Sequence, residues 1–146
     1  MLPLIGGGRT RMQPVYVGDV ADAAVAAIEG HAKPGAIYEL GGPQIWSLKD
    51  IMKGAVQYSG RERLFVPVPF WFAKMKAFFL QLLPHPILTV DQVRLLQSDN
   101  VVSQKAIAEG RTLSGLGMPA AHAIESIVPA YLERFRPHGQ FSVRRI

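Results

Sequence analysis

Glycine and proline divide this chain of 146 residues into short segments, and this punctuation constrains the fold more than any other feature. Leu2–Ile5 is a short apolar run that stops at three glycines, which predicts a strand followed by a turn. Leu64–Pro69 is extended, because each proline restricts the residue before it. Met12–Val17 and Ala36–Leu40 also have the character of strands. The chain is therefore expected to hold several short strands.

Start and stop signals for helices lie between these runs. Asp19 is predicted to be the N-cap of a helix, and the alanine-rich run that follows it ends at Gly30. Ser47–Asp50 is similar to a capping box and predicts a helix to about Ser59. Thr89–Gln92 is a second capping box, whose helix is expected to reach about Ser98.

The clearest helical periodicity lies near the C-terminus. In Ala121–Arg136, apolar residues recur at the spacing of one helix face. Pro129 falls inside this run, so a kink or a break is expected near Val128. The tail from Pro137 is expected to be irregular.

A further helix is expected over Pro69–Leu83, and it is apolar on nearly every side. Such a helix is either buried in a core or covered by a partner or a membrane surface. Core packing is the favoured interpretation, because the stems of Lys74 and Lys76 can cross an apolar surface. A helix of this length reaches only about 22 Å, short of the roughly 30 Å hydrocarbon core, so no membrane span is predicted.

The net excess of positive charge comes from the two ends of the chain. Six arginines lie in the first 11 and last 13 residues, and removing them from the net charge of +5 leaves −1: Arg9, Arg11, Arg134, Arg136, Arg144 and Arg145. No interleaving of basic and aromatic residues accompanies them, so no nucleic-acid partner is expected. The chain has no cysteine, which excludes disulfides and thiolate chemistry. Its four histidines form no helical pair, so no metal site is expected.

Two glycine-rich segments invite a phosphate-binding interpretation. Gly115–Ala120 has the form G-x-G-x-x-A, but it lacks a preceding strand and a later acidic residue, so a loop before a helix is favoured. Gly6–Gly8 lacks the lysine of a P-loop. A hairpin turn is the favoured interpretation there, and an anion-binding nest helped by Arg9 and Arg11 is the alternative.

Four segments resemble the extended short-chain dehydrogenases/reductases. Gln13–Ala23 carries a V-x-V-x-D-V-A pattern, and Tyr38–Pro43 is similar to a strand end of the form Y-x-x-G-G. Asp91–Val102 and Ile127–Phe135 narrow the resemblance to the atypical branch that contains the NADPH-binding accessory subunit of respiratory complex I and its bacterial relatives. The likeness runs from about Leu2 to Phe141.

Two marks of that family are absent from the sequence. The glycine-rich strand–turn–helix that holds the cofactor pyrophosphate has no counterpart. No tyrosine has a lysine four residues later, as the catalytic Tyr-x-x-x-Lys requires. The resemblance therefore implies an α/β fold: the C-terminal half of an extended Rossmann-type dehydrogenase/reductase, with short strands, about five helices and no nucleotide-binding half.

The same resemblance divides residues 1–146, a single segment, into parts. Residues 19–42 would supply a helix and a strand that rejoin the Rossmann sheet, residues 43–136 a substrate-side helical lobe, and residues 137–146 a basic tail. Arg11 and Gln13 are the substrate-binding candidates, and no catalytic, cofactor-binding or metal-binding residue is assigned. Without the rest of that sheet, the expected strand Ala36–Leu40 would leave an exposed edge. The isolated chain is therefore expected to be marginally stable.

The expected function is that of the substrate-side half of an NAD(P)-binding, dehydrogenase-like protein. The parent would bind NADP or NAD and serve respiratory complex I or a related quinone redox role, whereas this fragment would bind no cofactor and be inactive. The alternative is a non-catalytic interaction module that docks on a membrane or a respiratory complex through Phe70–Leu83. The expected location is cytoplasmic, or peripheral on the inner membrane face or the equivalent matrix side.

Overall fold

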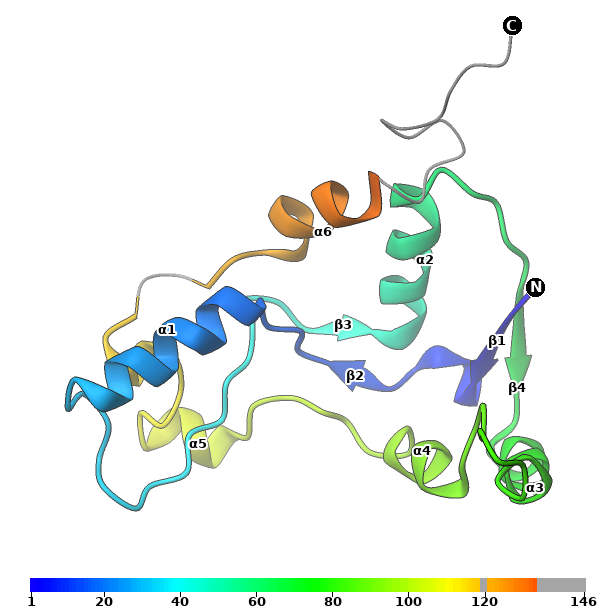
Figure 1. The fold of residues 1–146 in the computed structure, drawn as a ribbon, viewed down its shortest axis with the longest axis horizontal. Helices are drawn as coiled ribbons and strands as arrows, with labels where there is room; N and C mark the ends of the chain where they lie inside the picture. The colour runs from blue at the N-terminus through cyan, green and yellow to red at the C-terminus, as the bar shows by residue number, and fades with distance from the viewer. Residues whose placement is uncertain (119–120, 134–146) are drawn as a thin grey trace, which may run out of the picture.

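The computed structural model describes residues 1–118 and 121–133, which form an α/β arrangement of short strands and helices (Figure 1). The strands are β1 (Leu2–Ile5), β2 (Arg11–Met12), β3 (Trp46–Ser47) and β4 (Phe65–Val68). The helices are α1 (Val17–Ile28), α2 (Leu48–Tyr58), α3 (Phe70–Leu80), α4 (Val90–Leu95), α5 (Gln104–Ala108) and α6 (Ile124–Leu132). Two single turns of 3-10 helix, η1 (Gly6–Gly8) and η2 (Ser114–Leu116), complete these ranges. Helix α5 is the one that the sequence did not predict.

The strands form two separate pairs within the described residues. β1 and β4 lie parallel, in a register that joins Leu2 to Phe65 and Ile5 to Val68. β2 and β3 lie antiparallel and pair Arg11 with Ser47. The expectations for Leu2–Ile5 and for the extended run ending at Pro69 are thus confirmed.

Two expected strands differ from the structure. β2 ends at Met12, so the strand expected over Met12–Val17 is wrong beyond its first residue. The segment 36–40 is not a strand in this structure, so the strand expected from its alternation is wrong here. That residues 19–42 would rejoin a Rossmann sheet in the parent stays a prediction. The backbone N–H of Glu39 donates to the carbonyl oxygen of Arg111 (3.0 Å), and no ladder runs beside it in the described chain. Alternation along one segment gives a strand only when a neighbouring strand pairs with it.

Helix ends follow the local signals closely. Ser47 caps α2 by accepting a hydrogen bond from the Asp50 N–H (3.1 Å), and Thr89 and Gln92 form the expected capping box at α4. Helix α1 ends at Ile28, and its C-cap Glu29 precedes Gly30, whose φ of +92° suits glycine. Helix α4 ends at Leu95, earlier than expected.

Two helices depart from expectation at their ends or interiors. Helix α1 begins at Val17 with Tyr16 as its N-cap, so Asp19 is in the first turn and is not the cap that was predicted. A kink or a break was expected near Val128. Helix α6 continues through Pro129, so there is no break. The expected continuation of α6 to Arg136 and the basic tail 137–146 lie outside the described residues.

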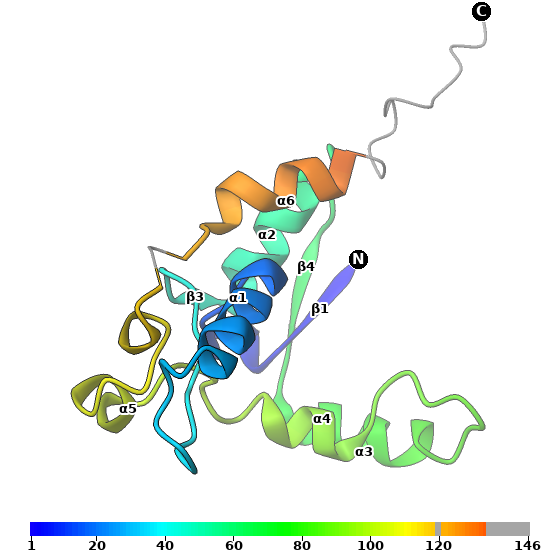
Figure 2. The same cartoon turned by 60° about the vertical axis from the view of Figure 1, so that its left-hand side comes forward.

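Most of the buried apolar residues form two small clusters at opposite ends of the molecule. One joins Ala23 and Ala26 of α1 to Leu113 and to Leu116 of η2. The other joins Ala73 and Ala77 of α3 to Val93 of α4. Figure 1 shows α1 and α5 at one end and α3 and α4 at the other, and Figure 2 shows the same separation after a turn of 60°.

Helix α3 does not pack as the sequence favoured. Only its two alanines are buried against α4, while Trp71 is 68% exposed and Phe79 is 65% exposed. Core burial is therefore wrong for Trp71, Phe78 and Phe79, which are exposed, whereas Phe70 packs against the buried cluster that α3 forms with α4. No helix in the described part of the chain is long and apolar enough to cross a membrane.

Candidate functional site

Arg11, the first predicted ligand residue, lies in β2 and binds Asp99. Its backbone N–H and its Nε each donate to the Asp99 carboxylate at 2.8 Å, and Nη2 lies 2.8 Å from Oδ2. These donors, the backbone N–H first, hold the pKa of Asp99 below its usual value. The Arg11 side chain stays 61% exposed, so the ion pair lies at the surface.

Gln13, the second predicted ligand residue, joins two distant segments. Its Nε2 donates to the carbonyl oxygen of Gly42 (2.8 Å), and its Oε1 accepts from the backbone N–H of Val102 (3.0 Å). The structure thus brings Arg11 and Gln13 to the same segment, 99–102. Both ends of the Gln13 amide are occupied by backbone groups.

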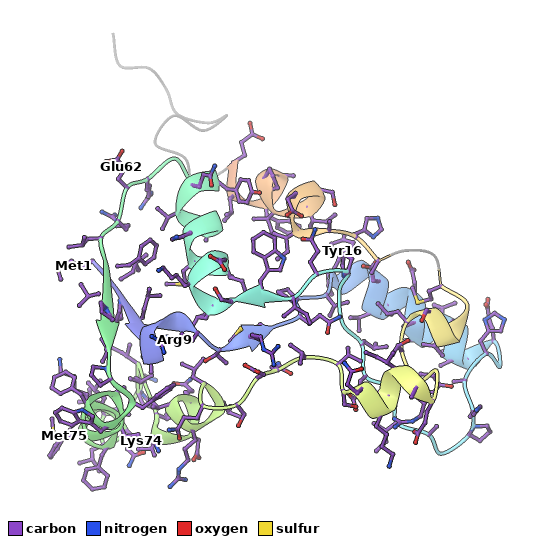
Figure 3. All side chains as sticks on the ribbon, turned by 180° about the vertical axis from the view of Figure 1, so that it is seen from behind. Met1, Arg9, Tyr16, Glu62, Lys74 and Met75 are labelled. Atoms are coloured by element: carbon purple, nitrogen blue, oxygen red, sulfur yellow. The ribbon has the colours of Figure 1, made fainter. Side chains whose placement is uncertain are left out.

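A larger cavity of about 780 Å³ lies between α2 and α6, next to the segment that leads into α1. Its walls are mainly apolar and aromatic, and its polar groups are few. In Figure 3, Tyr16 lies where the chain enters α1, and side chains of α2 and α6 gather beside it. Its lining includes Tyr16, Trp46, Lys53, Ala55, His122 and Ile127. We take this cavity, the α2–α6 cleft, as the candidate functional site.

Asp19 and His122 form a pair at the edge of the cleft. The His122 backbone N–H donates to Oδ2 of Asp19 (2.8 Å), and His122 Nδ1 lies 2.6 Å from Oδ1. Asp19 is buried, with 3% of its surface exposed, whereas the His122 side chain is 54% exposed. The pair therefore ties the start of α1 to the loop before α6 and leaves the imidazole accessible.

The charge state of Asp19 follows from these contacts. Burial raises the pKa of its carboxyl, but the hydrogen bonds from the His122 ring and backbone N–H, together with the charge of His122, outweigh that effect. The pKa of Asp19 consequently lies below its usual value. An ionised carboxylate only accepts hydrogen bonds, so the proton between the two residues belongs to Nδ1 of His122.

This fixed proton defines what His122 can do. With Nδ1–H directed at Asp19, Nε2 of the neutral ring carries the lone pair, and it becomes a donor when the ring is protonated. The Tyr16 ring packs edge-on against the imidazole, with ring centres 5.3 Å apart and an interplanar angle of 64°. The arrangement can orient one hydrogen bond to a molecule in the cleft.

Sequence reasoning missed this pair. Asp19 was expected to cap a helix, and His122 was one of the four histidines for which no metal site was expected. The two are 103 positions apart, and no local spacing signals such a contact. The V-x-V-x-D-V-A pattern marked Asp19 as part of a family motif but did not identify its partner.

A second cavity, of about 690 Å³, borders the glycines Gly6 and Gly7. All three glycines of η1 have positive φ, and a Cβ at Gly6 would lie 2.2 Å from the Phe70 ring. Close packing and the tight turn thus account for glycine here. The turn leads into β2, but β1 pairs with β4 and β2 pairs with β3, so the expected hairpin is wrong. Because no helix directly follows the turn, it lacks the helix N-terminus of a P-loop.

Gly115 and Gly117 do not have the structural setting of a dinucleotide fingerprint. Gly115 and Gly117 lie in and beside η2, and the element that precedes η2 in the described chain is helix α5, not a strand. A Cβ at Gly115 would lie 1.6 Å from the carbonyl oxygen of Gly110, so packing explains this glycine. No group of histidine and acidic residues suited to a metal ion is present among residues 1–118 and 121–133.

Comparison with known proteins tests the resemblance directly. No protein-family model matches the chain. It is 40% identical over 119 residues to the protein named NADH dehydrogenase [ubiquinone] 1 alpha subcomplex subunit 9, mitochondrial, of Arabidopsis thaliana. The resemblance to the complex I accessory subunit is confirmed. The match covers 73% of this chain and 29% of the Arabidopsis subunit.

Proposed function

We propose that this chain is the substrate-side part of an NAD(P)-binding, dehydrogenase-like protein that serves respiratory complex I or a related quinone redox role. The observation that carries the proposal is the 40% identity to a subunit whose name assigns it to NADH dehydrogenase (ubiquinone). The chain spans 29% of that subunit's length. The nucleotide-binding half of a Rossmann-type protein would then belong to the remainder of the parent.

The cofactor belongs to the parent in this proposal. NADP or NAD would be held by a glycine-rich turn at a helix N-terminus, and neither glycine segment described above has that form. The chain alone is then inactive and binds NADPH weakly or not at all. Calorimetric titration of the purified chain with NADPH tests this, and a low-micromolar affinity would contradict it.

Arg11 and Gln13 remain our candidates for the substrate side of the parent. The guanidinium of Arg11 is exposed even while it pairs with Asp99, which leaves room for a ligand contact. In a full-length parent, substituting both residues should weaken ligand binding. Unchanged ligand affinity in a folded double variant would remove both residues from the proposal.

The alternative is an interaction module, and the outward face of α3 favours it. Trp71, Met75, Phe78 and Phe79 are all exposed, and the Nζ of Lys76 lies 5.3 Å from the centre of the Phe72 ring. The helix itself contains two lysines and no acidic residue. Large apolar patches on a surface mark interaction sites, and the lysines suit an anionic membrane or an acidic protein surface. We propose a peripheral location at the inner membrane face or the equivalent matrix side.

Substitution of Phe78 and Phe79 tests docking through α3. The double variant Phe78→Ser and Phe79→Ser should lose binding to purified complex I or to anionic vesicles in co-sedimentation. Because both side chains are exposed, unfolding free energy should change by no more than about 0.5 kcal/mol per site. The variant Ile28→Ser, at an exposed position on α1, is the matched control. Equal sedimentation of the two variants would exclude α3 as the docking surface.

A further inference from the structure

The α2–α6 cleft has the dimensions and lining of a small-molecule site. Its volume of about 780 Å³ lies in the range of cavities that hold small ligands, roughly 300–1,000 Å³. Aromatic side chains stand on several sides of it, from the chain before α1, from β3, from α2 and from α6: Tyr16, Trp46, Tyr58 and Tyr131. Such walls favour a flat ring, because aromatic pairs gain beyond simple burial.

The His122 ring at this cleft is held in one orientation before any ligand binds. Asp19 accepts from both the backbone N–H and Nδ1 of His122, so the ring is fixed in position and tautomer. The Nε2 lone pair of the neutral ring can then accept one hydrogen bond from a ligand. A ligand hydroxyl is such a donor, and its methyl ether is not.

The charges around the cleft disfavour an anionic ligand. Asp19 at its edge and Asp50 on α2 are negative, while Lys53 on α2 is positive and has no ion pair with any described residue. The Asp50 carboxylate already accepts from the Ser47 hydroxyl (2.6 Å). The formal sum over these three side chains is negative, which does not favour a phosphate or a carboxylate.

We propose that the α2–α6 cleft binds a neutral, largely apolar phenol, whose ring lies among the aromatic walls and whose hydroxyl donates to Nε2 of His122. The inference rests on the proposed function only in treating this cleft as the substrate side. The geometry needs neither the nucleotide cofactor nor complex I.

The test uses Trp46, which lines the cleft, as the reporter. The chain has two tryptophans, and Trp71→Phe removes the exposed one on α3. In this background, para-hexylphenol and its methyl ether are titrated at a mildly alkaline pH. We expect saturable quenching of Trp46, with the phenol bound about three- to ten-fold more tightly than the ether.

Two variants locate the contact. His122→Phe keeps a ring but removes Nε2, so the phenol and the ether should bind equally. Ala55→Phe places a large side chain on the cleft wall and should abolish quenching, whereas Ala24→Phe, at an exposed position on α1, should leave it unchanged. A phenol preference that survives His122→Phe, or binding that survives Ala55→Phe, overturns the assignment.

The outcomes also separate the two proposals. Absence of saturable quenching in a chain that associates with complex I refutes the cleft assignment alone. Saturable, hydroxyl-dependent quenching in a chain that does not associate with complex I refutes the complex I role and leaves the cleft assignment standing.

Discussion

At the scale of single residues, Asp19 makes hydrogen bonds that join positions 103 apart in the sequence. It is buried in the first turn of α1 and accepts two hydrogen bonds from His122, which lies before α6. A carboxylate near a helix N-terminus is also favoured by the helix dipole. We therefore expect this one carboxylate to stabilise the fold, to hold α1 next to the loop before α6, and to orient the His122 ring.

The variant Asp19→Asn tests this role. An amide cannot accept both hydrogen bonds in the same way, so the free energy of unfolding at neutral pH should fall by about 1–3 kcal/mol. Asp22→Asn, at an exposed position on the same helix, should change it little. Urea titrations of the three proteins measure the difference, and equal midpoints for Asp19→Asn and Asp22→Asn would contradict the account.

The same carboxyl predicts a pH dependence. Its pKa is lower in the folded chain than its usual 3.8, so its contribution to stability is present above about pH 4 and is lost as the pH falls through the folded value. The stability gap between the natural chain and Asp19→Asn should therefore narrow as the pH falls below about 4. A gap that stays constant down to the acid transition would show that the ionised carboxylate is not the source.

At the scale of elements, local signals predict helix ends better than strands. The Ser47 and Thr89 caps and the stop at Gly30 were read from neighbouring residues, and each is where the sequence placed it. The strand expected over 36–40 depended on a partner that the described chain does not supply. Helix α5 was missed because its cap, Ser103, is itself held by Glu39, which is 64 positions away.

Two glycines next to the candidate site should respond oppositely to alanine. Gly54 lies inside α2, where a Cβ would meet Tyr58 at an ordinary 3.6 Å, so Gly54→Ala should raise the unfolding free energy by about 0.5–1 kcal/mol. At Gly42 a Cβ would lie 1.9 Å from the carbonyl oxygen of Pro14, so Gly42→Ala should destabilise the chain by more than 1 kcal/mol. Thermal unfolding distinguishes the two, and a loss of stability in Gly54→Ala would contradict the packing described for α2.

At the scale of the whole molecule, the candidate site could not be derived from the sequence. The resemblance and the local patterns predicted an α/β chain, and they singled out Arg11 and Gln13. The α2–α6 cleft joins segments from residues 14 to 132, and the pairing of Asp19 with His122 spans most of the chain. The outward face of α3 also required the structure, because an apolar helix is equally consistent with a core until its neighbours are known.

The separation of the two apolar clusters predicts that they loosen independently. Val93 is fully buried between α3 and α4, and Val93→Ala should lower the unfolding free energy of that end by about 1–3 kcal/mol. Hydrogen exchange should then speed up in α3 and α4 and stay unchanged in α1. The exposed Val25 gives the control Val25→Ala, and equal acceleration in α1 would show that the two ends unfold as one unit.

The proposed role in respiratory complex I is tested most directly on the endogenous protein. Membranes from the source of the chain, solubilised in mild detergent and separated on a native gel, allow the endogenous protein to be followed by mass spectrometry slice by slice. We expect its peptides to peak together with those of the core subunits of NADH:ubiquinone oxidoreductase. A profile in which the chain migrates apart from every form of that complex would contradict the account.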